Sequence, residues 1–166
     1  ELCNQNEVML TVDGADHTLT AFAWNEDSGG YLVRAWAAEG SDGCELAESS
    51  DKYSGMTMTL MIYGQPEAGD VVSIVEPAPP GSKGNFVAEV TVDDSVTGAS
   101  YRSQAKSGSF EITSVAAIGD LETSGFGVSL SDGAEIAESS FIACSCDSVT
   151  GGGGEEGGGE GADDGG

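Results

Sequence analysis

The sequence is poor in positive charge and in long apolar runs, and each shortage excludes a class of partner. It contains 5 Lys and Arg residues against 29 Asp and Glu residues, which gives a formal net charge of −24. A field of that sign repels phosphate backbones and anionic headgroups, so we expect no nucleic acid and no lipid surface as a partner. No apolar run approaches the roughly 18 residues of a membrane-spanning helix, so we expect no transmembrane segment.

Signatures of catalysis are also scarce. His17 is the single histidine, so a Ser-His-Asp arrangement would depend on this one residue beside Asp16. The phosphate-binding pattern G-x-x-x-x-G-K-[ST] does not occur, and a pair of catalytic carboxylates has no local signature among so many acids. We therefore expect a non-catalytic protein.

Four cysteines are present, and their spacing favours disulfides over a zinc site. Cys144 and Cys146 form a C-x-C pair, which lacks the geometry of a C-x₂-C knuckle, and His17 alone could complete the ligand set. We expect Cys3 and Cys44 to pair with Cys144 and Cys146, in either combination, in an oxidising compartment. The chain begins at Glu1, so we expect that a signal peptide was removed and that the protein is extracellular or on the cell surface.

Strand-like runs occupy the chain from residue 7 to residue 146. Apolar and polar residues alternate in them, and Gly, Pro, Asp and Ser separate them, which is typical of antiparallel, half-buried strands. Both faces of 17–24 and 31–38 carry apolar side chains, so we expect these strands to be central or to have one face covered by a partner. The runs lie at 8–12, 17–24, 31–38, 56–63, 71–75, 86–92, 107–115, 124–130 and 131–147, with a short one around Tyr101.

This pattern predicts an all-β protein, an antiparallel β-sandwich or flattened barrel of about ten strands. We expect residues 1–150 to form one disulfide-linked domain, with a proline-rich loop at 76–84 that cannot lie inside a sheet. Residues 151–166 contain ten Gly and five acidic residues. They predict a flexible, solvated tail, and glycine strands packed in an assembly are the alternative.

One segment occurs twice. SDGCELAESS at 41–50 and SDGAEIAESS at 131–140 agree at eight of ten positions. A duplicated sheet unit would extend the match into the flanks, and the flanks do not continue it. We favour two local copies of a turn followed by a strand.

The order of these segments resembles a broad group of bacterial secreted proteins and lipoproteins of unknown function. The resemblance rests on TVDG at 11–14, TAFAW at 20–24 and GSFEITS at 108–114, and it covers most of residues 7–146. It implies a small β-sandwich and no catalytic residues. A lipoprotein begins at its lipidated cysteine, whereas here Glu1 and Leu2 precede Cys3, which departs from a membrane-anchored form.

We expect an extracellular structural or surface-assembly protein whose subunits self-associate, as in a fibre or filament, by β-strand addition. Strand edges almost free of lysine favour such pairing. The candidates for the exchanged strand are Val8, Leu10 and Val12.

The alternative is a calcium-dependent module that binds polysaccharide or another surface protein. Trp24, Tyr31 and Trp36 would form its aromatic platform, although aromatic residues in such strands are more often part of the core. Acidic residues at strand ends would supply hard oxygen ligands for calcium, but none reproduces a known calcium loop. These candidate ligands are Asp27, Asp42, Asp93 and Asp94.

Overall fold

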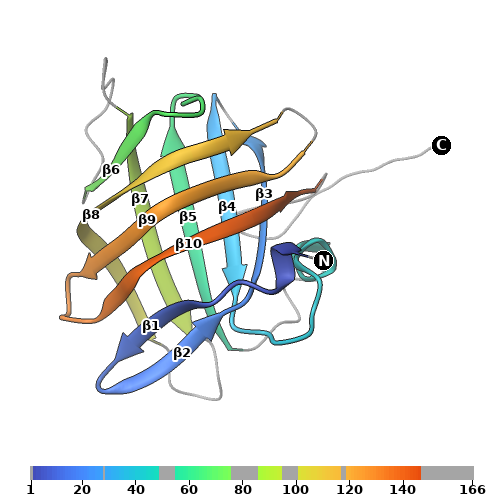
Figure 1. Cartoon of the computed structure of the whole chain (residues 1–166). Coiled ribbons are helices and arrows are strands. Elements are labelled where there is room, and N and C mark those ends of the chain that lie inside the picture. Colours follow the sequence, from blue (N-terminus) through green and yellow to red (C-terminus); the bar gives the residue numbers. More distant parts are fainter. Residues whose placement is uncertain are drawn as a thin grey trace.

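A computed structural model of the chain describes residues 2–27, 29–48, 55–75, 86–94, 101–116 and 119–146. These residues form ten strands and two short helices (Figure 1). The helices are η1 (Leu2–Asn4), a 3₁₀ turn, and α1 (Gly43–Glu48). The strands are β1 (Val8–Val12), β2 (Ala15–Leu19), β3 (Ala21–Asp27), β4 (Gly30–Trp36), β5 (Met56–Tyr63), β6 (Val71–Val75), β7 (Phe86–Asp94), β8 (Tyr101–Val115), β9 (Leu121–Leu130) and β10 (Glu135–Ser145).

Eight of the strands close into a barrel. Their order is β3-β4-β5-β7-β6-β8-β9-β10, and β10 returns to pair with β3. The pairs β10–β3 and β6–β7 are parallel, and the other neighbours are antiparallel. Figure 1 shows β8, β9 and β10 crossing at a steep angle over the layer of β3, β4, β5 and β7. The all-β prediction is therefore confirmed, and the purely antiparallel sandwich is wrong because closure onto β3 requires a parallel pair.

The inward side chains of both layers form the main core. Phe22 stacks on Phe141 with ring centroids 4.5 Å apart, and Phe126 meets Phe141 edge to face at 5.2 Å. Edge-to-face pairs and offset stacks are the favoured arrangements of aromatic rings, and they add to the free energy of burial. All three rings are less than 2% exposed, so the centre of the barrel is filled by side chains.

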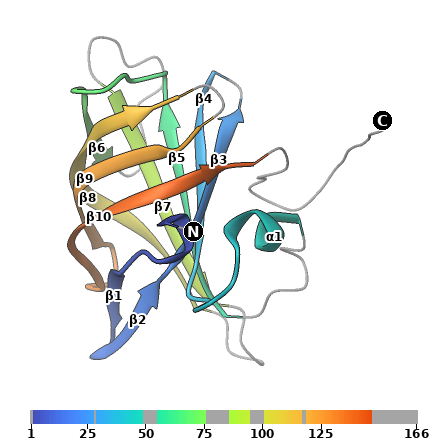
Figure 2. The same ribbon diagram turned by 45° about the vertical axis from the view of Figure 1, so that its right-hand side comes forward.

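A smaller core lies outside the barrel, where α1 covers β3 and β4 (Figure 2). Leu32 and Trp36 point outward from β4 and pack against Ala47 of α1. This helix is the cover that the two-faced apolar pattern of β4 requires. The covering element of this face is therefore a helix of the same chain, and a partner is not needed to bury it.

Two disulfides tie the ends of the domain together. Cys3 is bonded to Cys144 and Cys44 to Cys146, with a Cα–Cα distance of 5.5 Å in each pair. The prediction that Cys3 and Cys44 pair with the C-x-C cysteines is confirmed, and the structure now gives the connectivity. One bridge fixes η1 to β10 and the other fixes α1 to the residue after β10.

Three elements differ from the sequence-based expectation. The short run around Tyr101 and the run at 107–115 form one continuous strand, β8. The run at 17–24 is two strands, because Thr20 interrupts the pairing and its N–H donates to the carbonyl of Trp36 (3.0 Å). Residues 43–48, expected as a turn and strand, form α1 instead. The predicted loop at 76–84 and the tail at 151–166 lie outside the described residues.

Candidate functional site

The hairpin of β1 and β2 is attached outside the closed barrel, and β2 is its open edge. β1 pairs with β2 along five residues, from Val8 opposite Leu19 to Val12 opposite Ala15. On its other side β1 pairs with β10, where Leu10 lies opposite Ile136. β2 stands at the end of the strand order, and among the described residues it has no strand on the side away from β1. Figure 1 shows it as the outermost ribbon at the lower end of the molecule.

This arrangement corrects the candidate strand for exchange. Val8 and Leu10 are fully buried in the main core, and Val12 packs against it. A strand with partners on both sides presents no free row of N–H and C=O groups. Val8, Leu10 and Val12 therefore hold the hairpin on the barrel, and the open edge is β2.

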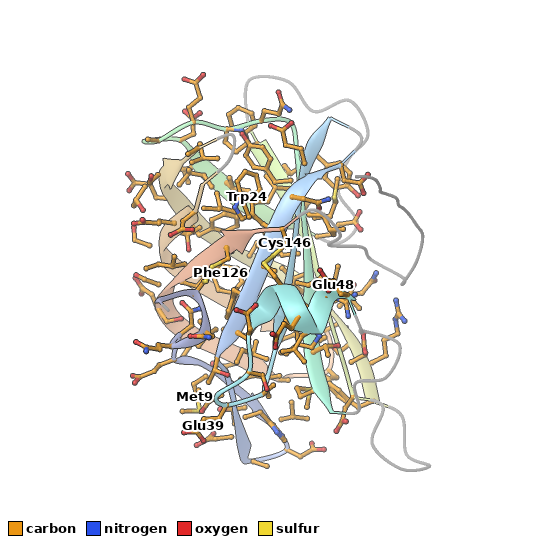
Figure 3. All side chains as sticks on the ribbon, turned by 90° about the vertical axis from the view of Figure 1, so that its right-hand side faces the viewer. Met9, Trp24, Glu39, Glu48, Phe126 and Cys146 are labelled. Atoms are coloured by element: carbon orange, nitrogen blue, oxygen red, sulfur yellow. A yellow bond between two sulfur atoms is a disulfide. The ribbon has the colours of Figure 1, made fainter. Side chains whose placement is uncertain are left out.

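The predicted aromatic platform is not exposed. Trp24, Tyr31 and Trp36 are 1%, 5% and 0% exposed, respectively. Trp24 meets Tyr31 edge to face at 5.2 Å and its Nε1 donates to the carbonyl of Gly119 (3.0 Å). Figure 3 shows Trp24 on the same side of the sheet as Phe126, in the interior of the barrel. A stacking platform needs free ring faces, so the platform prediction is wrong for these residues.

Trp36 belongs to the outer core, where Arg34 lies over its ring with the guanidinium carbon 5.5 Å from the ring centroid. Burial lowers the pKa of Arg34, and the charge of Asp93 partly opposes that shift. Cation–π contact and a nearby carboxylate are the usual means of holding a partly covered arginine. This pair therefore has a packing role.

The four predicted calcium ligands are spread over the molecule. Asp42 caps α1, since its Oδ1 accepts from the N–H of Cys44 (2.8 Å) and of Glu45 (3.2 Å). Asp93 accepts from Thr57 Oγ1 at 3.1 Å, beside Asp94 at the end of β7. Asp27 ends β3 in a different hairpin. No group of three or more potential ligand side chains occurs within the part of the chain that the structure describes.

His17, the single histidine, lies in the middle of β2 opposite Leu10 and is half-buried. The neighbouring carboxylate of Asp16 accepts a hydrogen bond from Thr11 Oγ1 at 2.7 Å, across the hairpin. That contact is a cross-strand pair that stabilises the hairpin. It directs Asp16 to the face of the sheet, where it adds negative charge close to the open edge.

A polar cluster at the β9–β10 turn was not expected from the sequence. Ser103 Oγ donates to Asp132 Oδ1 (3.1 Å), and the same carboxylate oxygen accepts from the N–H of Ala134 (3.1 Å). Burial first and the Asp132 carboxylate second raise the pKa of Tyr101 to about 12. Desolvation raises the pKa of Asp132, but the nearby Tyr101 phenol and the hydrogen bonds from Ala134 and Ser103 lower it by more, so the net shift is downward. The repeated SDG motif was the one signal that could have drawn attention to this turn.

Comparisons with known proteins assign no family to the chain. No family model, no curated protein and no solved structure matches it. Within the described residues, no helix combines the length and the apolar character needed to cross a bilayer.

Proposed function

We propose that the chain is a non-catalytic, extracellular structural protein that enters a surface assembly by accepting a strand at the β2 edge. Where the donated strand comes from the next copy, the product is a fibre. The observation that carries this proposal is the edge of β2, which has no neighbouring strand on its outer side among the described residues and lies beside a closed barrel of eight strands.

The physical reasons are those of β-strand addition. An incoming extended segment satisfies the unpaired N–H and C=O groups of an edge strand, and backbone hydrogen bonds supply its affinity. The acceptor must stay folded while it exchanges partners. Two disulfides, with sequence separations of 141 and 102 residues, restrict unfolding of the barrel behind that edge.

The test is the mass of native protein in solution, measured by light scattering and negative-stain microscopy with and without a calcium chelator. Regular assemblies that survive chelation are expected. A monomer whose melting temperature falls on chelation would contradict the proposal and support the calcium-dependent binding module.

Two proline variants at adjacent positions, His17→Pro and Thr18→Pro, test whether the assembly contact lies at the open edge of β2. Successive N–H groups along a strand point to opposite sides, so one proline removes an N–H from the β1 ladder and the other removes one from the open edge. One variant is expected to lose stability, and the other to keep stability and lose assembly. Assembly that persists in the stable variant would exclude the β2 edge.

A further inference from the structure

A groove of about 940 Å³ lies beside β2 and leads to its open edge. Its floor includes His17 and Thr18 of β2 and Met9 of β1. One wall is the segment before β1, which ends at Glu7, and the other is the loop after β4, which includes Glu39. Figure 3 shows Met9 and Glu39 side by side at this end of the molecule.

The loop wall stands on the open side of β2. The N–H of Thr20 donates to the carbonyl of Trp36 (3.0 Å), so the chain that follows Trp36 continues past the edge of β2 at which the described part of the chain places no strand. A segment added to β2 would therefore run along Ala15–Thr18 and reach the groove between Glu7 and Glu39. Both glutamates are exposed, so their carboxylates are available to an incoming chain.

The charges around this edge are negative. Glu7 and Glu39 line the groove, none of whose described lining residues is a lysine or arginine, and Asp16 lies on β2 itself. Asp13 adds a further carboxylate at the turn between β1 and β2. The chain as a whole has a formal net charge of −24.

This charge distribution discriminates between incoming strands. Antiparallel pairing of β2 with the β2 of a second copy would bring two sets of the same carboxylates together, and like charges across an interface oppose association. Charge on an edge strand is also a common means of preventing edge-to-edge pairing between copies. Lysine or arginine at alternate positions of an incoming strand would instead face Glu7 and Glu39.

We propose that the β2 edge and its groove accept a basic, extended segment of another polypeptide, and reject the β2 edge of a second copy. This inference rests on the proposed role of β2 as an acceptor edge. It identifies the donor by its chemistry: a strand with lysine or arginine on the face that meets the groove.

The probe is a synthetic peptide of alternating lysine and valine, compared with the same peptide carrying glutamine or glutamate in place of lysine. Binding to the full chain is measured by fluorescence anisotropy, and the site by hydrogen exchange at Ala15–Thr18. The lysine peptide is expected to protect those of these amides that point away from β1, and to bind about tenfold more tightly than the glutamine peptide, with an affinity that falls as salt rises.

Three charge-matched variants separate the groove from the general field of the protein. Glu7→Gln and Glu39→Gln are each expected to lower the affinity for the lysine peptide by about two- to fivefold. Glu48→Gln removes the same charge from exposed α1, which lies away from Glu39 in Figure 3, and is expected to leave binding unchanged. An equal effect of all three variants would overturn the proposal, because binding would then follow net charge alone.

The remaining outcomes distinguish this inference from the proposed function. If the glutamine peptide protects Ala15–Thr18 as well as the lysine peptide does, β2 accepts strands without selecting basic ones, and this inference alone fails. The same holds if the β2 strands of two copies pair with each other and protect these amides. If no peptide protects them and the protein remains a monomer, the acceptor edge itself is wrong.

Discussion

The side-chain amide of Asn6 pairs with the peptide group of Ile142 as a neighbouring strand would. The N–H of Ile142 donates to Asn6 Oδ1 (2.8 Å), and Asn6 Nδ2 donates back to the carbonyl of Ile142 (3.0 Å). Along this side of β10, the pairing with β1 includes Leu10 opposite Ile136, and the pairing with β3 begins at Cys144. Asn6 fills the gap between them, and so joins the outer hairpin to the barrel.

Asn6→Ala is expected to destabilise the protein by about 3 kcal/mol, because buried backbone groups lose their partners. Besides Ile142, the Asn6 amide reaches the carbonyls of Cys3 (3.0 Å) and Thr20 (3.1 Å). Urea unfolding measures the change. Gln5→Ala is the control, since Gln5 is exposed and its loss should fall within about 0.5 kcal/mol. Equal losses in the two variants would contradict this account of Asn6.

The two disulfides are expected to have different local effects. In the chain-entropy model, either loop contributes about 4–5 kcal/mol. The pair of substitutions Cys44→Ser and Cys146→Ser should in addition release α1, because a six-residue helix is too short to be stable by itself. Hydrogen exchange should then become fast at 43–48, whereas barrel amides stay protected. Cys3→Ser with Cys144→Ser is the control, and fast exchange at 43–48 in both variants would contradict this view.

The strands that local pattern predicts best are those with regular alternation and clear breaks. The run at 71–75 corresponds to β6 and the run at 56–63 to β5. Alternation gives the face of each side chain, but it carries no information on which strand lies beside which. The parallel closure of β10 onto β3, and the change of partner along β10, depend on contacts between residues more than 100 positions apart, such as Ser145 with Trp24.

The repeated segment shows where local prediction stops. Asp42 accepts from the N–H of Cys44, and Asp132 accepts in the same way from the N–H of Ala134, so both copies begin with the same turn. After the turn, residues 43–48 form α1, whereas residues 135–140 are the first part of β10. The sequence pattern predicted this shared turn, but not the different structures that follow.

The reason for the difference lies in the surroundings of each copy. Cys44 is tied to Cys146, and Ala47 packs in the outer core on β4. In the second copy Ile136 is 2% exposed and lies between Leu10 of β1 and Val128 of β9. Tertiary packing overrides the weak propensity of a short segment. The open edge of β2 was missed for a related reason, because the break at Thr20 depends on its hydrogen bond to Trp36.

Gly108 and Gly127, on the paired strands β8 and β9, are expected to respond differently to alanine. A Cβ at Gly108 would lie within van der Waals overlap of the Gly127 carbonyl, and the φ of Gly108 is +147°. Gly108→Ala should therefore cost about 2–4 kcal/mol. At Gly127 the nearest atom to an added Cβ is 3.5 Å away, an ordinary contact, so Gly127→Ala should cost less than about 1 kcal/mol. Thermal unfolding of both variants measures the difference. Similar melting temperatures would exclude the close approach of Gly108 to the Gly127 carbonyl.

Tyr101 is expected to make the protein less stable in alkali. Its pKa is raised from 10.0 to about 12, mainly by burial and then by Asp132, so the folded state keeps a proton that the unfolded chain has lost. The stability that this proton provides is complete below the unfolded pKa and is lost as pH rises from about 10 to about 12. Tyr101→Phe has no phenol to ionise, so its free energy of unfolding should fall less over that range.

Urea unfolding at about pH 9 and at about pH 11 measures the difference between the two proteins. Tyr63→Phe is the matched control. The pKa of Tyr63 is also raised, first by burial and then by Glu89, but this side chain is 41% exposed, so solvent screens the shift. The free energy of unfolding of Tyr63→Phe should therefore fall between the two pH values by nearly as much as that of the wild type. Burial is the first cause of the raised pKa of Tyr101. If the unfolding free energy of Tyr101→Phe depends on pH as strongly as that of the wild type, this phenol is open to water in solution. The β9–β10 turn would then not cover it as the structure indicates.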